Sequence, residues 1–324
     1  MNLVRRSILL SLFAASALTS QAQPQNFPSK PIRFIIPYGA GGSGDAAARS
    51  VGEAMGKMWG QPFLVDNKPG GNEIVAAQLV ASSPGDGYTF LMASEATASV
   101  NPFIYSKLPY DPRDLVPVAR MLTSPYVLVV SPDFPANNLK EFIEYSKRNP
   151  GKFNFGSQGI GSPGHLASSW LNNIHGLSMV HVPYKTLPQG VGEVMAGRVE
   201  SMFGPIGTIG PLVKAGKLKA LAVSGKTRQS EVPSVPTFIE SGMPTFDASF
   251  YLAIFAPKGT PPEIIQRFAR DMRTVITDPE FEKKHFQPQA YQPIGDTPEQ
   301  FIEFLKKDRE VAAEKVKLAG AKLD

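Results

Sequence analysis

Short apolar runs alternate with amphipathic stretches along most of this 324-residue chain. Runs rich in β-branched or aromatic residues predict strands at "IRFIIP", "PFLVDN", "GYTFLMAS", "YVLVVSP", "KFNFGS", "SMVHVPY", "SMFGP" and "LKALAVSG". Helical periodicity predicts helices at residues 45–59, 139–148, 164–173, 262–277 and 298–319, and at "NEIVAAQLVAS" and "GVGEVMAGRVE". This alternation is typical of an α/β architecture.

The chain is long enough for two domains, yet no repeat or low-complexity linker divides it. Two extended segments bounded by proline, residues 124–132 and 246–257, are candidate crossings between two units. We therefore expect a discontinuous first lobe formed by residues 23–124 and 247–324. Residues 125–246 are expected to form the second lobe.

The first 22 residues have the pattern of an export signal. Arg5 and Arg6 precede an apolar core at residues 8–18, and Ser20-Gln21-Ala22 fits a small-x-small cleavage site. A membrane anchor is the alternative, but this core is shorter than the roughly 20 residues that a bilayer requires. We expect residues 1–22 to be a cleaved signal peptide and the mature protein to reach the periplasm by the general secretory route.

Composition excludes several classes of function. Cysteine is absent, so the chain offers no disulfide, thiolate nucleophile or cysteine metal site. The four histidines (165, 175, 181 and 285) lack metal-ligand spacing, and no serine stands in G-x-S-x-G. The net charge of +5 includes two arginines of the leader and comes without basic clusters, which argues against nucleic acid. We expect a protein that is not an enzyme and has no metal or cofactor.

A glycine-rich loop in "IIPYGAGGSGDAAAR" satisfies the dinucleotide pattern G-x-G-x-x-G with Gly39, Gly41 and Gly44. Asp66 ends the next strand about 20 residues on, where an acid that binds ribose would stand. Pro37, Asp45 and the export signal argue against nucleotide binding. An exported nicotinamide-dependent oxidoreductase is therefore kept as the alternative function.

The same loop can bind another anion. The first turn of a helix leaves backbone N–H groups without intrahelical partners, at the positive end of the helix dipole. Gly41, Gly42, Ser43 and Gly44 would present such donors to a carboxylate or phosphate. Asp45 is interpreted as a helix cap, with contact to a ligand ammonium or amide as the alternative. A plain βα turn without a ligand is the structural alternative.

A second loop of this kind, "FNFGSQGIGSPGHL", lies in the other predicted lobe. It offers Ser157, Gln158 and Gly161, and Ser162 is placed to cap a helix that begins at Pro163. Two such helix ends facing one cleft could bind the two ends of a dianion. His165 lies in the first turn, where a neutral imidazole could contact the ligand or serve the fold alone.

Several ordered stretches carry a family resemblance. "FPSKPIRFIIPYGAGGSGDAAAR", "VDNKPGG", "SSPGDGYTFLMAS", "NPFIYSKLPYDPRDLVPVAR", "HVPYK", "AGKLKALAVSGKTRQSEVPSVPTFIESG" and "FAPKGTPPEII" occur in the order seen in periplasmic receptors of tripartite tricarboxylate transporters, the Bug receptors. The chain resembles this family over nearly its whole mature length. The resemblance implies a two-lobed type II periplasmic-binding fold that closes on a small carboxylate in a cleft between the lobes, and delivery to a two-component membrane permease.

The resemblance also implies site residues. The first loop carries over as residues 38–45 and so adds Tyr38, and the second carries over as residues 157–162. Further positions expected to face the cleft are Ser94, Thr97, Tyr184, Pro205, Ile206, Phe250 and Tyr251.

The sequence departs from the family pattern after "NKPG", where Asn72 and Glu73 replace small residues. Tyr38, Phe250 and Tyr251 would give an aromatic wall suited to an aromatic acid, or would simply be core residues. We expect a monomeric receptor for a di- or tricarboxylate that is open to aromatic acids. A receptor that signals without transport would have the same sequence features.

Overall fold

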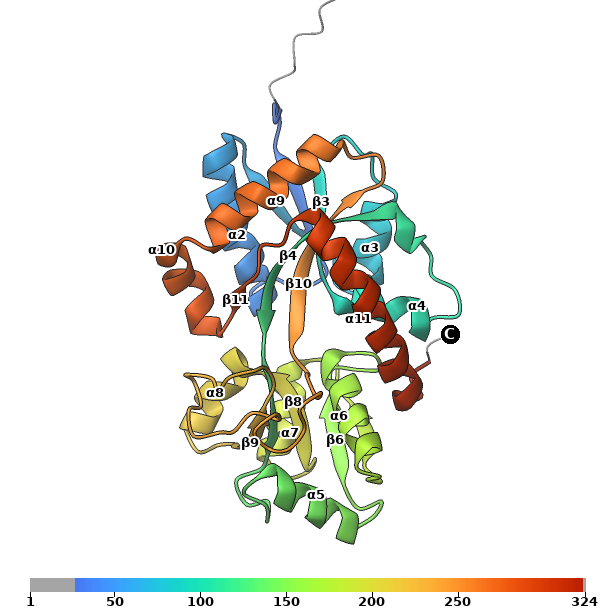
Figure 1. Ribbon diagram of the computed structural model, residues 1–324, viewed down its shortest axis with the longest axis vertical. Coiled ribbons are helices and arrows are strands. Elements are labelled where there is room, and N and C mark those ends of the chain that lie inside the picture. The colour runs from blue at the N-terminus through green and yellow to red at the C-terminus, as the bar shows by residue number, and fades with distance from the viewer. Residues whose placement is uncertain (1–26, 323–324) are drawn as a thin grey trace, which may run out of the picture.

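The computed structural model describes residues 27–322, which form two α/β lobes stacked along the long axis (Figure 1). The upper sheet has the order β11-β4-β10-β3-β1-β2 and the lower sheet the order β7-β6-β8-β5-β9. The upper strands are β1 (Ile32–Ile36), β2 (Phe63–Asn67), β3 (Thr89–Ser94), β4 (Leu115–Ser124), β10 (Phe250–Pro257) and β11 (Gln292–Pro293). The lower strands are β5 (Tyr126–Val130), β6 (Asn154–Ser157), β7 (Val180–Pro183), β8 (Ser201–Pro205) and β9 (Lys219–Val223). The predicted two-lobed α/β architecture is confirmed.

Parallel strand pairs determine where the helices lie. β1 pairs in parallel with β2 and β3, and β6 pairs in parallel with β7 and β8. Parallel neighbours require a crossover connection, which is usually a helix. These crossovers are α2 (Ser43–Trp59), α3 (Ile74–Ala81), α6 (Pro163–Ile174) and α7 (Leu187–Met195). Each of these helices therefore begins near the carboxyl end of the strand that precedes it.

The remaining helices cover the two sheets or connect them. They are α4 (Asn101–Ile104), α5 (Leu139–Arg148), α8 (Ile206–Lys214), α9 (Pro262–Ile276), α10 (Pro279–Phe281) and α11 (Pro298–Ala319), with shorter helical turns at Ala96–Val100, Pro112–Asp114, Glu282–Phe286 and Gln287–Gln289. Among residues 27–322, no helix is long and apolar enough to cross a membrane.

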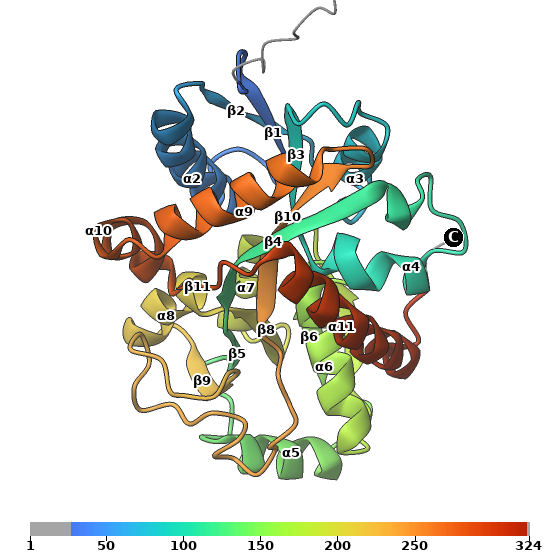
Figure 2. The same cartoon turned by 45° about the horizontal axis from the view of Figure 1, so that its top comes forward.

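The chain passes between the sheets along two adjacent strands. β4 ends at Ser124 and β5 begins at Tyr126, so Pro125 alone separates them (Figure 2). The return begins with Phe250 of β10, which pairs with Ser124 in an antiparallel register. Thr123 Oγ1 also donates a 2.8 Å hydrogen bond to the Phe250 carbonyl oxygen. Two paired strands thus connect the lobes, while the lobe boundaries given above remain a prediction.

Each lobe has its own hydrophobic core. In the upper lobe, Phe34 and Phe90 pack with Phe268 of α9. In the lower lobe, Phe203 packs with Phe238 and the side chains around them. Because burial of apolar area is the main stabilising contribution to folding, each lobe holds together through its own contacts. A change in the relative orientation of the lobes would leave these two cores largely intact.

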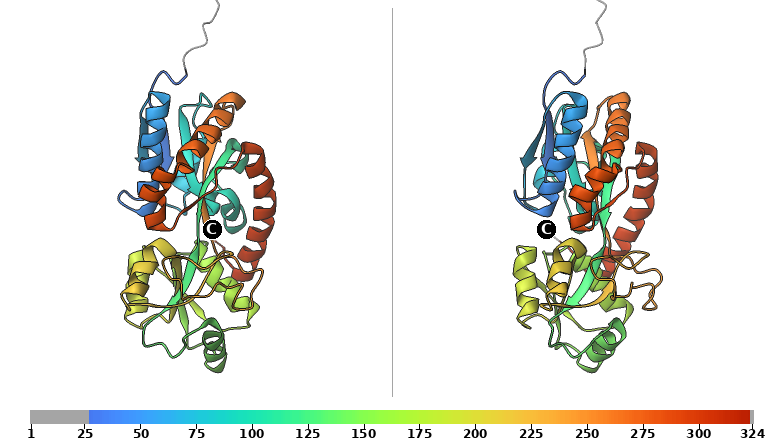
Figure 3. Two further views of the ribbon diagram at one scale, coloured as in Figure 1. Left: turned by 60° about the vertical axis from the view of Figure 1, so that its left-hand side comes forward. Right: turned by 90° about the vertical axis from the view of Figure 1, so that its left-hand side faces the viewer.

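The C-terminal helix contacts both lobes. α11 begins with a capping box in which Thr297 and Gln300 exchange side-chain and backbone hydrogen bonds. Its first half buries Phe301 in the upper core, whereas Val316 packs in a cluster with Leu166 of α6. Figure 3 shows the helix along one side of the molecule, reaching the lower lobe. The sequence predicts this helix but places it wholly in the first lobe. Its contact with the lower lobe is seen only in the structure.

Candidate ligand-binding cleft

A cavity of about 390 Å³ lies between the two lobes. Its upper wall includes Tyr38, Ser43, Glu73, Ser94, Phe250 and Tyr291, and its lower wall includes Gln158, Ser162, Lys185, Leu187 and Pro205. Aromatic side chains and polar groups therefore share one cavity. This combination is typical of pockets that bind small molecules.

Helix N-termini from both lobes converge on this cavity. Ser43 is the first residue of α2, and Leu187 is the first residue of α7. Ser162 and Pro205 are the capping residues immediately before α6 and α8. Since each N-terminus combines unpaired N–H groups with a positive dipole end, their convergence favours an anion.

The first loop is closed by its own carboxylate. Asp45 accepts hydrogen bonds from the Gly41 N–H at 2.9 Å, from Arg49 Nε at 3.0 Å and from Asn67 Nδ2 at 2.9 Å. The hydrogen bond from Arg49 is the main cause that lowers the pKa of Asp45 to about 2. Asp45 therefore does not cap α2 as the sequence suggests. The capping position is Gly42, and Asp45 fixes the loop that precedes it.

In the second loop, Ser162 caps α6 as predicted. Its Oγ accepts a hydrogen bond from the His165 N–H at 3.4 Å and donates one to the Gly159 carbonyl oxygen at 2.8 Å. The Gly161 N–H donates to His165 Nδ1 at 3.2 Å. Ser157 Oγ bonds His181 Nε2 at 2.6 Å. The Gly161 N–H and the Ser157 hydroxyl therefore form hydrogen bonds within the lower lobe. These bonds stabilise the second loop.

The buried His165 lies beside the half-buried His181. Its ring centroid lies 4.1 Å from that of His181, and Phe155 stacks on His181. Burial lowers the pKa of both histidines to about 4, and for His165 the neighbouring His181 adds to the shift. Both rings face a different, smaller cavity that Phe155 also lines. The structure therefore favours the structural alternative for His165 over ligand contact.

A family model described as tripartite tricarboxylate transporter family receptor matches residues 47–315. The chain belongs to this family. The resemblance seen in the sequence is thereby confirmed, and the members of this family are solute-binding receptors.

Individual relatives support the assignment. The receptor is 38% identical over 280 residues to a UPF0065 protein of Bordetella pertussis, covering 86% of each chain. A solved structure of R. palustris Rpa4515 with adipate has a TM-score of 0.83 at 27% identity, covering 92% of this chain and all of the other. MatC from Rhodopseudomonas palustris, solved with bound malate, has a TM-score of 0.78 at 26% identity, covering 90% of this chain and all of the other.

The structure brings some of the expected site residues into the cleft of the receptor. Those that line it are Tyr38, Ser43, Ser94, Gln158, Ser162, Pro205 and Phe250. Those that lie outside its lining are Gly41, Gly42, Asp45, Thr97, Ser157, Gly161, His165, Tyr184, Ile206 and Tyr251. Most members of the second group belong to the two glycine-rich loops or to the first turns of the helices that follow them.

Sequence reasoning missed ten of the lining residues, which are Pro37, Gly70, Asn72, Glu73, Tyr126, Pro163, Lys185, Leu187, Leu252 and Tyr291. Lys185 and Leu187 follow β7 and precede or begin α7, so the convergence of strand ends in α/β folds could have indicated them. Tyr291 has no local signal, because it reaches the cleft from the loop that precedes β11.

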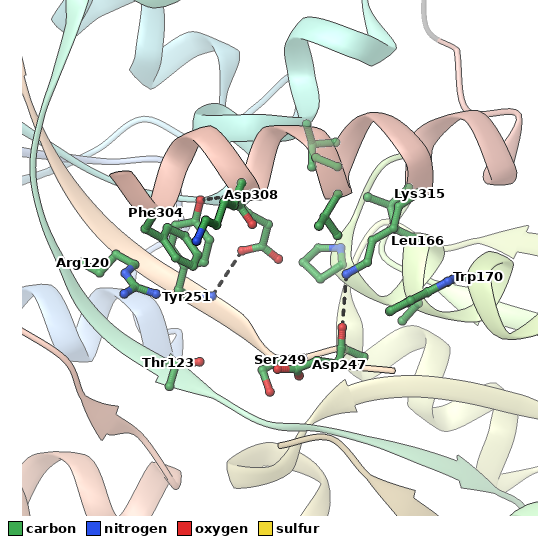
Figure 4. A pocket seen from close by; sticks show the side chains of 18 of the residues that line it. Arg120, Thr123, Leu166, Trp170, Asp247, Ser249, Tyr251, Phe304, Asp308 and Lys315 are labelled. Atoms are coloured by element: carbon green, nitrogen blue, oxygen red, sulfur yellow. Dashed lines mark hydrogen bonds between the residues drawn. The ribbon is translucent and has the colours of Figure 1, made fainter. Parts of the chain in front are cut away.

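Neighbouring residues of β10 face opposite sides, because side chains alternate along a strand. Phe250 faces the cleft, whereas Tyr251 lines a second cavity of about 380 Å³ beside α11 (Figure 4). The Tyr251 hydroxyl donates to Asp308 at 2.7 Å. This placement corrects the expectation that Tyr251 belongs to the cleft.

The second cavity of the receptor is rich in carboxylates. Glu95 accepts a 3.3 Å hydrogen bond from the Tyr251 N–H, and Asp308 and Asp247 also line the cavity (Figure 4). Burial, with added repulsion from Asp308, raises the pKa of Glu95 to about 8. Lys315 Nζ lies 4.5 Å from the centroid of the Trp170 ring and donates to the Asp247 carbonyl oxygen. Arg120, Lys307 and Lys315 line the same cavity, so its carboxylates lie among cationic side chains.

Proposed function

We propose that this chain is a periplasmic receptor that captures a small organic carboxylate in the interlobe cleft and delivers it to a two-component membrane permease. The observation that carries the proposal is the convergence of helix N-termini from both lobes on one cavity. The R. palustris relatives with adipate and malate support a carboxylate ligand. The family description supports the permease as partner.

Closure of the lobes is the proposed capture step. The ligand binds first to one wall of the cleft and then completes hydrogen bonds with the other wall, so ligand favours the closed form. Separate cores and two connecting strands support this movement, which would also change the packing of α11 on α6. The lower wall contributes the exposed Lys185, which adds positive charge to the helix ends.

The energetic demand is modest. Micromolar affinity corresponds to about 8 kcal/mol of net binding free energy. Hydrogen bonds to a charged group contribute about 1.5–3 kcal/mol each before ordering costs are subtracted. A few N–H and hydroxyl donors on each wall therefore suffice. Such an affinity still allows release when the permease holds the lobes apart.

Export is part of the proposal. The leader at residues 1–22 lies outside the residues that the structure describes, and solved relatives include a periplasmic transporter protein and the periplasmic binding protein BugD. We propose that the mature chain acts as a monomer in the periplasm and works without a metal or cofactor.

A thermal-shift screen of the mature protein tests the proposal. A ligand that binds only the folded state raises the melting temperature by mass action, by an amount that grows with its concentration. We expect a saturable increase with one or more small carboxylates, and loss of uptake of the same acid when the gene is deleted. An increase with NAD or NADP and with no carboxylate would favour the exported oxidoreductase. Binding with unchanged uptake would indicate a receptor that signals.

A further inference from the structure

The upper wall of the cleft contains a set of donors suited to a carboxylate. The Ser94 N–H and hydroxyl lie at the end of β3, and the Thr97 N–H and hydroxyl lie in the helical turn that follows. The Tyr38 hydroxyl joins them from the loop after β1. Backbone amides and hydroxyls at the start of a helical segment are typical ligands of an anion.

The carboxylate of Glu73 occupies these donors. It accepts hydrogen bonds from Ser94 Oγ at 2.7 Å and from Thr97 Oγ1 at 2.8 Å. It also accepts from the Ser94 N–H at 3.1 Å, the Thr97 N–H at 3.3 Å and the Tyr38 hydroxyl at 2.9 Å. Glu73 is 9% exposed and still lines the cavity. A protein carboxylate therefore stands where a ligand carboxylate could bind.

The backbone is strained to hold Glu73 in this position. Its φ of 73° and the φ of 51° at Asn72 lie in the left-handed region, which is unfavourable for residues with a Cβ. Two hydrogen bonds hold this conformation: Asn72 Nδ2 donates to Asn101 Oδ1, and Asn101 Nδ2 donates to the Asn72 carbonyl oxygen. Strained conformations of this kind persist where surrounding contacts fix them, often at functional sites.

The two walls of the cleft consequently differ in charge. On the upper wall, Glu73 occupies anion-binding donors with a carboxylate of the chain itself. Among the described residues, the lower lobe lines the cavity with no Asp or Glu, and it adds Lys185 to the N-termini of α6 and α7. A ligand carboxylate is favoured at the lower wall, and a second carboxylate at the upper wall would meet Glu73.

We propose that the ligand is a monocarboxylate that carries a nitrogen donor, an ammonium or a carboxamide, at its other end. The carboxylate binds the lower wall near Ser162 and Lys185. The nitrogen faces Glu73 and the aromatic rings of Tyr38 and Phe250, which also favour a cationic group. Glu73 is thus a specificity residue that excludes dicarboxylates. This inference rests on the proposed function of the cleft.

Titration calorimetry of the mature protein with matched ligands tests this inference. Adipate is compared with 6-aminohexanoate and with its own monoamide, and succinate with 4-aminobutanoate and its monoamide. In each series the chain length is constant and only the distal group changes. We expect an amine or amide member to bind at least tenfold tighter than the dicarboxylate of the same length.

Two variants of Glu73 separate its charge from its conformation. Glu73→Gly suits the positive φ and releases the donors, so dicarboxylate affinity should rise at least tenfold and exceed that of the amine. Glu73→Gln removes the charge at nearly constant volume. It should reduce the ratio between the affinity for the amine or amide and the affinity for the dicarboxylate. Glu53→Gln, at an exposed residue of α2, is the matched control and should change neither affinity.

The outcomes separate the two proposals. If the wild type binds dicarboxylates as tightly as their amine and amide partners, the role of Glu73 is refuted and the carboxylate receptor stands. The role of Glu73 is also refuted if Glu73→Gly folds, as judged by thermal unfolding, and still prefers the amine or amide over the dicarboxylate as strongly as the wild type does. If none of these ligands binds and the thermal-shift screen finds no other carboxylate that binds, the carboxylate receptor is refuted and the inference falls with it.

Discussion

Gly207 at the start of α8 packs directly against the backbone of Gln289 in the upper lobe. A Cβ atom at Gly207 would overlap the Gln289 carbonyl group, and a carbonyl group of the main chain cannot move aside as a side chain does. The contact lies between the lobes, because Gly207 follows β8 and Gln289 precedes β11. Absence of a side chain at this position therefore allows the lobes to approach to the observed distance.

Substitution of Gly207 by alanine is expected to oppose closure. The added methyl group should keep the lobes apart at this point and weaken ligand binding by about tenfold or more, since bonds to the second wall form poorly. Thermal stability without ligand should change little, because each lobe retains its core. Titration calorimetry measures the affinity. Gly192→Ala, in α7 with no atom within 4 Å of the new Cβ, is the matched control and should bind normally. Equal affinities of the two variants would contradict the closure account.

Asp45 is expected to stabilise both the first loop and the fold. Asp45→Ala removes the acceptor for Gly41, Arg49 and Asn67 and leaves their donors without this partner. Loss of these bonds should cost about 1–3 kcal/mol of unfolding free energy. Ligand affinity should fall as well, because the loop beside Ser43 is no longer fixed. Denaturant unfolding and calorimetry measure the two effects. Glu53→Ala, at an exposed ion pair of the same helix, should leave both nearly unchanged.

The alternation of Phe250 and Tyr251 predicts different effects for two adjacent substitutions. Phe250→Ala removes a ring from the cleft and should weaken binding by about 1–2 kcal/mol. Tyr251→Phe removes only the hydroxyl that donates to Asp308 behind the connecting strands, so affinity should be retained while stability declines. Calorimetry and thermal unfolding of both variants provide the test. Loss of affinity in Tyr251→Phe alone would place the ligand in the second cavity.

The raised pKa of the Glu95 carboxyl should make the stability of the fold fall as the pH rises. Its carboxyl pKa is about 8 in the folded protein against a reference value of 4.5, so the folded form binds the proton more tightly. This contribution is fully present below pH 4.5 and is lost as the pH rises through 8. Glu95→Gln stays neutral and retains an oxygen that can accept from Tyr251.

A comparison of the wild type with Glu95→Gln measures the contribution of the Glu95 carboxyl to stability. The melting temperature of the wild type relative to Glu95→Gln should decline between about pH 5 and about pH 8.5, and the variant should be the more stable protein at the upper end. A difference that stays constant over this range would show that Glu95 is ionised in the folded state.

The sequence predicted what local pattern determines. Strands and crossover helices followed from hydrophobic periodicity, and Ser162 was correctly expected to cap α6 because serine before proline is a strong helix-start signal. Both glycine-rich loops indeed border the cleft. These features depend on residues close together in the chain.

The sequence did not predict contacts between segments that are far apart in the chain. Glu73 reaches Ser94 and Thr97 through a left-handed backbone that no periodicity indicates. The bridging of α11 to α6 depends on how the two lobes are oriented, and an amphipathic helix pattern gives no information on its partner. The carboxylate of Asp45 likewise acts on a loop amide instead of the helix end that its position suggested.

A crystal structure of the mature protein with the carboxylate that gives the largest thermal shift tests the central claim most directly. We expect electron density between the lobes, with the ligand carboxylate within hydrogen-bond distance of the lower-wall loop at Ser162. Density in the cavity beside α11, among Glu95, Asp308 and Lys315, would contradict the assignment of the cleft as the binding site.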